Sequence, residues 1–129
     1  MKRIGLAIFM AFIVVLCAEA GKKNEPKIKF EKTTHDFGNI KEDGGTVSTE
    51  FEFVNSGDKP LKIESARAEC GCTKPEYPKG EIAPGQQGVI KVSFNPYGRP
   101  GGFIKKVTVR TNGNPSKTIL KIRGSVVPR

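Results

Sequence analysis

Apolar and polar residues alternate with a period of two in several short stretches of this chain. Within residues 47–53, Val47, Phe51 and Phe53 fall on one face of an extended strand, while a serine and two glutamates fall on the other. The same period recurs in residues 90–94, 107–109 and 120–122. No ten-residue window shows helical periodicity. The pattern therefore predicts β-strands with one buried and one solvated face.

Residues typical of turns separate these stretches, as in Asn-Ser-Gly-Asp-Lys-Pro at 55–60 and Asn-Gly-Asn-Pro at 112–115. Seven strands are expected, at residues 27–33, 46–55, 60–68, 79–83, 88–95, 103–111 and 117–126. About seven short strands in a domain of roughly 100 residues predict an all-β fold, an immunoglobulin-like β-sandwich of about seven antiparallel strands. A small barrel is the alternative architecture.

The chain contains no tryptophan, so the expected core consists of aliphatic residues and phenylalanines. The expected bulky core residues are Phe30, Phe37, Phe51, Phe53, Phe94 and Phe103.

The first 20 residues have the layout of a secretory signal peptide. Basic residues at positions 2 and 3 precede an apolar run at 4–16, and Ala-Glu-Ala at 18–20 forms a cleavage site. The apolar run is shorter than the about 20 residues that a membrane-spanning helix needs. We therefore expect residues 1–20 to be removed, leaving a domain at 21–129 that is periplasmic or secreted and has no transmembrane segment. Acylation of Cys17 as a lipoprotein is the alternative, although Leu16 is larger than the residue that normally precedes such a cysteine.

The chain carries 22 basic and 13 acidic residues, for a formal net charge of +9. Such a charge favours acidic partners, among them anionic envelope polymers and lipid head groups. The alternative is a solvated surface, because charges of both signs are interspersed along the sequence. Export argues against a nucleic-acid partner, so the expected partner is a protein or an envelope polymer.

Cys70 and Cys72 form the reactive pair that the processed chain would keep, and they follow an expected strand. A disulfide requires Cα atoms about 4.4–6.8 Å apart, whereas residues i and i+2 of an extended strand lie near the upper limit, at about 6.6–6.8 Å. Bridging therefore requires a bend, which Gly71 would permit. In an oxidising compartment we expect a local disulfide or a reversible dithiol near the surface, in a small strained ring.

Three other interpretations of this pair remain open. The cysteines could be a structural staple or two small buried apolar residues. They could bind copper or zinc, but further ligands are scarce, because both methionines lie in the signal peptide and His35 is the only histidine. They could be a catalytic dithiol, but Cys-x-x-Cys in a βαβ setting is absent. We expect no cofactor and no enzymatic activity.

Two other groups of residues merit attention. His35 and Asp36 could form an acid–base pair, but adjacent strand residues point to opposite faces, which favours a polar strand-to-turn junction. Tyr97 and Arg99 lie in a glycine-rich loop, and Tyr77 in a proline-rich loop. Tyrosine and arginine are enriched at interface hot spots, so these three residues are candidates for a binding surface, with plain loops as the alternative.

Several segments in series resemble one family: His-Asp-Phe-Gly-x-Ile at 35–40, Phe-Val-Asn-Ser-Gly at 53–57, Cys-Gly-Cys-Thr at 70–73, Ile-Ala-Pro-Gly at 82–85 and Gly-Arg-Pro-Gly at 98–101. Over residues 30–126 the chain resembles the exported bacterial domain of unknown function fifteen-seventy-three (DUF1573). The resemblance implies an immunoglobulin-like fold related to Hydin-type and major-sperm-protein-type domains, which are interaction modules. It implies no activity or ligand.

We therefore expect a non-enzymatic binding or assembly module of the cell envelope, carrying the Cys70–Cys72 pair. An edge strand of the sandwich could bind partners by strand addition. The alternative function is a thiol-based copper- or zinc-binding protein or a redox protein.

Overall fold

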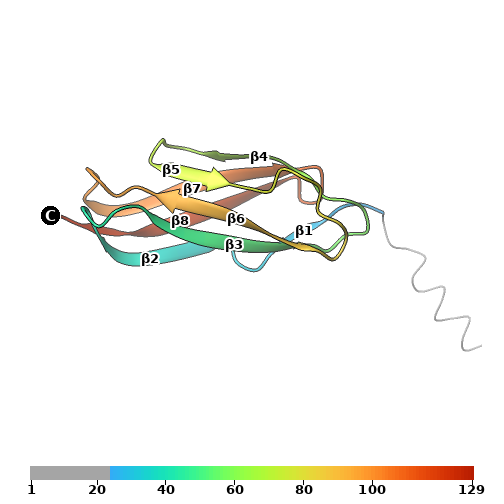
Figure 1. The fold of residues 1–129 in the computed structure, drawn as a ribbon, viewed down its shortest axis with the longest axis horizontal. Coiled ribbons are helices and arrows are strands. Elements are labelled where there is room, and N and C mark those ends of the chain that lie inside the picture. The colour runs from blue at the N-terminus through green and yellow to red at the C-terminus, as the bar shows by residue number, and fades with distance from the viewer. Residues whose placement is uncertain (1–23) are drawn as a thin grey trace, which may run out of the picture.

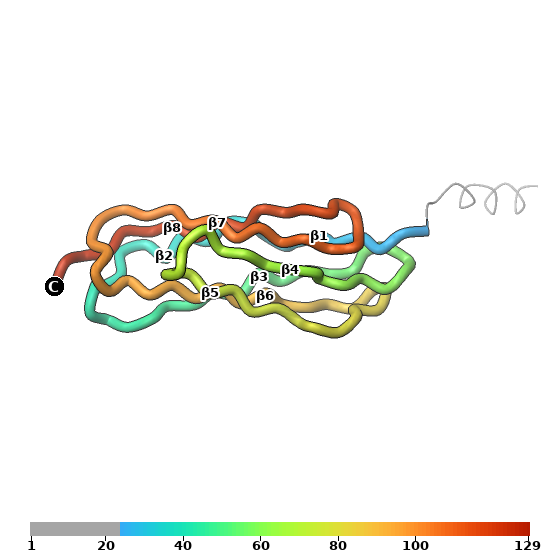
Figure 2. Tube along the Cα trace, turned by 90° about the horizontal axis from the view of Figure 1, so that it is seen from above, coloured from blue at the N-terminus to red at the C-terminus, as the bar shows by residue number. Residues whose placement is uncertain are grey.

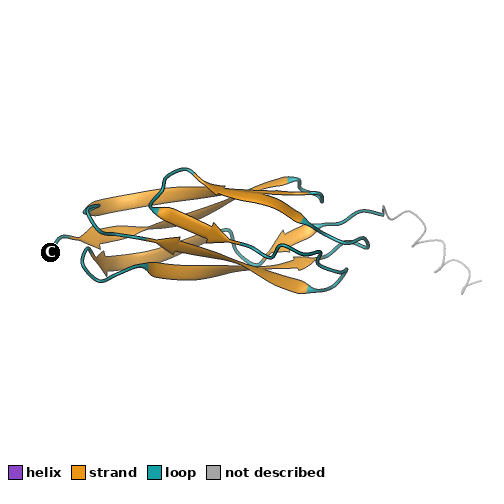
Figure 3. Ribbon diagram, turned by 45° about the horizontal axis from the view of Figure 1, so that its top comes forward, coloured by secondary structure: helices purple, strands orange, loops and turns teal. Residues whose placement is uncertain are grey.

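Eight β-strands form the fold in the computed structural model, which describes residues 24–129 (Figure 1). The strands are β1 (Ile28–Phe30), β2 (Thr34–Lys41), β3 (Val47–Asn55), β4 (Ile63–Ala68), β5 (Thr73–Glu76), β6 (Gln87–Phe94), β7 (Gly101–Thr111) and β8 (Lys117–Val127). The described residues contain no helix (Figure 3), and so none that could span a membrane. The expected signal peptide at 1–20 lies outside the described residues.

The strands form two four-stranded sheets, in the orders β1-β3-β6-β5 and β2-β8-β7-β4. The sheets pack face to face, and their strands run along the long axis of the molecule (Figures 1 and 2). All neighbouring strands are antiparallel except β2 and β8, which are parallel. The predicted all-β sandwich is confirmed, with eight strands and one parallel pair in place of seven antiparallel strands. The immunoglobulin-like relationship stays a prediction.

Phenylalanines and aliphatic residues fill the space between the sheets, as the alternation predicted. Phe51 and Phe94 are 0% exposed and Phe53 is 2% exposed. The other three expected core phenylalanines are partly buried and pack against this core: Phe30, Phe37 and Phe103.

The prediction of a strand at residues 79–83 is wrong. Only Ile82 pairs with another strand-like residue, through an isolated bridge in which Leu61 and Ile82 exchange backbone hydrogen bonds of 2.9 and 2.8 Å. Ile82 is buried, but its neighbours on both sides are exposed. A single inward-facing residue between Gly80 and Pro84 therefore produced the pattern of a short strand without forming one.

Two strands were not expected. In β2, the pairing with β8 shifts register between Asp36 and Asn39, and Gly38 has a positive φ of 69°. This bulge interrupts the alternation that marks a strand in sequence, and it returns Ile40 to the core side. Strand β5 contains Pro75, which is tolerated because β5 lies at a sheet edge.

Two of the connections that cross between the sheets lie on either side of β4, and we call them the first and the second crossing. Residues 56–62 carry the chain from β3 to β4, and residues 69–72 carry it back from β4 to β5. The first crossing is organised by Asn55, which is 0% exposed. Its side-chain amide donates to the carbonyl oxygens of Lys59 and Ile82 at 2.8 and 2.9 Å, and its oxygen accepts from the amides of Lys27 and Gly57 at 3.3 and 3.0 Å. The second crossing contains the two cysteines.

Candidate functional site

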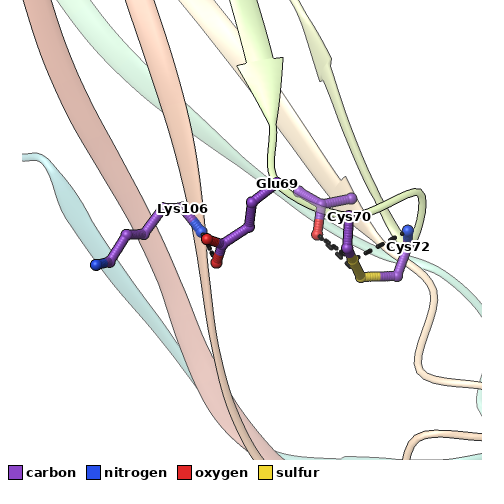
Figure 4. The surroundings of a disulfide bond; sticks show 5 residues. Glu69, Cys70, Cys72 and Lys106 are labelled. Carbon is purple, nitrogen blue, oxygen red and sulfur yellow. Dashed lines mark hydrogen bonds between the residues drawn. A yellow bond between two sulfur atoms is a disulfide. The ribbon is translucent and has the colours of Figure 1, made fainter.

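The second crossing between the sheets brings Cys70 and Cys72 together. Their sulfur atoms are in direct contact in the arrangement of a disulfide (Figure 4), and their Cα atoms are 5.4 Å apart. The predicted bend between them is confirmed. The two cysteines were expected near the surface, but they lie deeper. Cys72 is only 7% exposed and belongs to the core, and Cys70 is partly buried against it. Whether the pair is oxidised in the cell stays a prediction.

Polar groups of the same turn surround the two sulfur atoms. The amide of Cys72 donates to Cys70 Sγ at 3.2 Å. The hydroxyl oxygen of Thr73 lies 3.4 Å from Cys72 Sγ and 4.0 Å from Cys70 Sγ, and Thr73 is 5% exposed. Thr73 therefore gives both sulfur atoms a hydrogen-bonding neighbour inside the core. Sequence reasoning identified Thr73 only as part of the family pattern, because a threonine that starts a strand carries no signal of its own.

Gly71 does not bend the chain in the expected way. It is absent from the residues with positive φ among the described part of the chain, and a Cβ atom added to it would meet nothing within 4 Å. The bend therefore uses backbone angles that any residue can adopt. The turn is closed instead by a hydrogen bond of 3.3 Å from the amide of Thr73 to the carbonyl oxygen of Cys70.

Three hydrogen bonds tie the crossing to neighbouring strands, and one of them runs from the amide of Glu69 to the carbonyl oxygen of Lys106 at 3.3 Å. Glu69 turns away from the cysteines, and its carboxylate accepts from the amide of Lys106 on β7 at 3.1 Å (Figure 4). On the other side, the carbonyl oxygen of Cys72 accepts from the amide of Asn95 at 3.0 Å. The cysteine turn is thus joined to β7 and to the end of β6.

The bond to Asn95 connects the cysteines to the loop that contains two of the predicted binding residues. The side chain of Asn95 accepts from the amide of Tyr97 at 3.1 Å, and the amide of Arg99 donates to Pro96 at 3.0 Å. Tyr97 is 60% exposed, with the guanidinium of Arg129 5.1 Å from its ring centre. Tyr97 and Arg99 therefore belong to an exposed loop whose base is bonded to Cys72.

Tyr77, the third predicted binding residue, lies beyond the other end of β5. It is partly buried against the core, and the ammonium of Lys79 lies 3.8 Å from its ring centre. The structure therefore does not join Tyr77 to the cysteine turn and the Tyr97 loop in one surface.

His35 and Asp36 do not form an acid–base pair, because adjacent residues of β2 point to opposite faces of the sheet. Asp36 accepts from the amide of Gly38 at 2.8 Å and lies 3.5 Å from Arg123. His35 accepts from Lys32 at 3.0 Å. Burial lowers the pKa of His35, the positive charge of Lys32 lowers it further, and Asp36 opposes the shift. The neutral form of His35 is therefore favoured, and the residue lies on β2 rather than beside the cysteines.

No group of three or more His, Cys, Asp or Glu side chains that could hold a metal ion occurs among residues 24–129. Among these residues, Cys70 and Cys72 thus have no third such side chain beside them to complete a larger metal site.

A family profile described as "Protein of unknown function (DUF1573)" matches residues 28–126 of this chain. The chain belongs to this family. No curated protein matches it in sequence.

Three solved structures resemble the fold at low sequence identity. A protein of unknown function from Porphyromonas gingivalis W83 has a TM-score of 0.69 and 16% identity, over 84% of this chain and 50% of that chain. The VesB protease of Vibrio cholerae has a TM-score of 0.58 and 12% identity, over 92% and 35% of the two chains. The YadV chaperone has a TM-score of 0.56 and 15% identity, over 78% and 52%. The chain spans about half the length of the Porphyromonas protein, and these likenesses concern the fold alone.

Proposed function

We propose that this protein is a non-enzymatic binding or assembly domain of the cell envelope, in which the Cys70–Cys72 pair controls the shape of a recognition loop. One observation carries the proposal. Cys72 is in contact with Cys70 through sulfur and is bonded through its carbonyl oxygen to Asn95, at the base of the loop with Tyr97 and Arg99. A change in the state of the pair would therefore act on an exposed surface rich in hot-spot residue types.

Recognition through loop side chains fits this region better than addition of a strand to β5. The carbonyl oxygen of Cys72 points toward β6. The backbone polar groups of successive strand residues point to alternate sides, so the backbone nitrogen of Pro75 points toward the open edge of β5. Proline has no N–H to donate there, and proline at an open edge hinders pairing with another strand. The edge of β5 is thus protected, whereas the Tyr97 side chain is exposed.

Export through the signal peptide at 1–20 is part of this proposal, because an oxidising compartment would keep the pair closed. The first experiment therefore determines the state of the pair in protein taken from intact cells under acid quenching. Intact mass after alkylation, with and without prior reduction, should show two cysteines that react only after reduction. Two freely alkylated cysteines would refute the disulfide, and bound copper or zinc in the purified protein would support the metal-binding alternative.

The second experiment tests the recognition loop in the native cell. A photo-cross-linking amino acid at Arg99 should capture a defined partner, and the same group at Lys59, at the far end of the molecule, should not. The Cys70→Ser, Cys72→Ser double variant should lose the Arg99 cross-link while keeping its fold. Retention of the same cross-link in that variant would show that the pair does not control the loop.

A further inference from the structure

The outer face of the β2-β8-β7-β4 sheet concentrates positive charge. We call this surface the basic face and define it by six exposed side chains of β4, β7 and β8: Arg67, Lys106, Arg110, Lys117, Lys121 and Arg123. The register of β7 and β8 places Lys106 directly opposite Lys121, and Arg110 directly opposite Lys117. Like charges directly opposite each other in a sheet are destabilising. The arrangement therefore costs the fold some stability.

Neighbouring carboxylates neutralise little of the positive charge of the basic face. Among the described residues, Arg123 is the one member of the basic face that forms an ion pair, with Asp36 at 3.5 Å. Glu69 lies beside Lys106, but its carboxylate accepts from the backbone amide of Lys106. The remaining cations are available to an anion outside the protein.

The outer face of the other sheet is organised differently. Lys91 on β6 lies opposite Glu50 on β3 and opposite Glu76 on β5. One positive side chain therefore lies between two negative side chains. Ser48 and Ser93, which also face each other, are hydrogen-bonded at 3.0 Å. The excess positive charge of the chain is therefore not spread evenly over the sandwich.

Protection of a sheet edge does not explain the basic face. Lysines commonly prevent edge-to-edge association when they lie on edge strands. Here the opposed cations lie on β7 and β8, which are the two central strands of their sheet. These strands already have partners on both sides, so their outward charges have no edge to protect.

Two exposed isoleucines lie among these cations. Ile104 is 59% exposed and opposite Arg123, and Ile119 is 37% exposed and opposite Thr108. Ile104 and Arg123 also line a hollow of about 620 Å³ on this face. The face follows the long axis of the molecule (Figures 1 and 2). An elongated surface that combines cations with protruding apolar side chains matches the head-group layer of a bilayer, where phosphates and hydrocarbon are both within reach.

We propose that the basic face binds the surface of a membrane that contains anionic phospholipids. The lysines and arginines contact lipid phosphates, and Ile104 and Ile119 enter the head-group layer. A soluble polyanion would use the charges but gain little from the isoleucines, which is why the lipid surface is the favoured partner. This binding is independent of Cys70 and Cys72 and of the recognition loop.

The test uses protein that starts at Gly21 and sedimentation with lipid vesicles. All core side chains lie between Ile28 and Val126, so this protein contains the whole sandwich and lacks the apolar run at 4–16, which would itself enter lipid. It should bind vesicles made of equal parts phosphatidylglycerol and phosphatidylcholine, and not vesicles of phosphatidylcholine alone. Equal binding to both kinds, or to neither, would overturn the proposal.

A charge variant locates the binding surface. The triple variant Lys106→Gln, Arg110→Gln, Lys121→Gln should bind the mixed vesicles about 100-fold more weakly, at about fivefold for each charge near an anionic surface. The matched control is Lys29→Gln, Lys74→Gln, Lys91→Gln, which removes the same charge from exposed positions on the other sheet and should keep most binding. Equal losses in the two variants would show that net charge alone drives the association. Thermal melting of each variant verifies its fold.

An apolar variant separates a lipid surface from a soluble polymer. Ile104→Ser should weaken vesicle binding about tenfold, because an exposed apolar side chain no longer enters the head-group layer. The same variant should bind dextran sulfate as the unmodified protein does. Vesicle binding that is unchanged in Ile104→Ser, together with strong binding to dextran sulfate, would assign the basic face to a soluble polyanion instead.

Discussion

The two crossings that flank β4 are fixed by different chemistry. At the first crossing, residues 56–62, the buried Asn55 makes four hydrogen bonds, two of which join it to Lys27 and Ile82, 28 and 27 positions away along the chain. At the second, residues 69–72, the sulfur contact between Cys70 and Cys72 joins residues only two positions apart. The first set of bonds is indifferent to redox conditions, whereas the second contact depends on them.

This difference separates the stability of the fold from the state of the candidate site. Loss of the Asn55 bonds would leave buried polar groups without partners in the interior of the sandwich. Opening of the cysteine pair would leave all ladder pairings of β4 and β5 in place, because these involve neighbouring strands β7 and β6. The second crossing can therefore change shape in a protein that stays folded.

The largest expected effect is that of Asn55→Ala. The substitution removes four hydrogen bonds from a fully buried site, so it should lower the free energy of unfolding by about 3 kcal/mol or more. Urea denaturation followed by circular dichroism measures this change. Asn95→Ala is the matched control, because the exposed Asn95 side chain accepts one bond and should cost less than about 1 kcal/mol. Similar losses at both positions would contradict the role assigned to Asn55.

Gly57→Ala should have the next largest effect at the first crossing. A Cβ atom at position 57 would overlap the carbonyl oxygen of Glu25 and lie 2.6 Å from the amide nitrogen of Lys27. Both are backbone atoms, so the chain must shift, at a cost of about 2 kcal/mol. The midpoint of urea unfolding should fall accordingly, and an unchanged midpoint would show that this crossing is looser than the structure indicates.

Reduction of the Cys70–Cys72 pair should have a smaller effect. The ring that the pair closes is so short that its opening should lower the free energy of unfolding by at most about 1.5 kcal/mol. Thermal melting with and without a phosphine reductant, at constant pH, measures the difference. Complete unfolding on reduction would mean that the second crossing holds the fold together, as the first one does.

Gly71→Ala should have the smallest effect, within about 0.5 kcal/mol of the unmodified protein. Position 71 has open space for a Cβ atom and no unusual backbone angle, in contrast to position 57. The same denaturation series compares the two glycines directly. A large loss at Gly71 would restore the special backbone role that its sequence position first implied.

The two crossings also show how far the sequence predicts this structure. Alternation identified the strands around Phe51 and Ile90 because each has one buried face over many residues. It missed β2, where the bulge at Gly38 breaks the period, and it placed a strand around Ile82, where a single buried residue lies in an irregular segment. Local pattern thus predicts long regular strands and fails where a strand is bulged, short or replaced by one bridge.

The candidate site was predicted in part. The closeness of Cys70 and Cys72 follows from their spacing, and the structure confirms it. The contact of Thr73 with the sulfur atoms and the bond from Asn95 to Cys72 could not be predicted, because they depend on how β5 aligns with β6. The opposition of Lys106 and Lys121 likewise requires the register of β7 and β8. Contacts within one turn can thus be predicted from the sequence, whereas contacts that depend on the alignment of two strands cannot.

The parallel pairing of β2 with β8 has a consequence for when the protein can fold. Thr34 aligns with Lys121, and Lys41 with Val127, so an early strand completes its hydrogen bonds only with the last one. A growing chain therefore holds an unfinished sheet until residues 117–127 have been made. Contacts so distant along the chain also slow folding. Before β8 has been made, β2 thus has no strand to pair with.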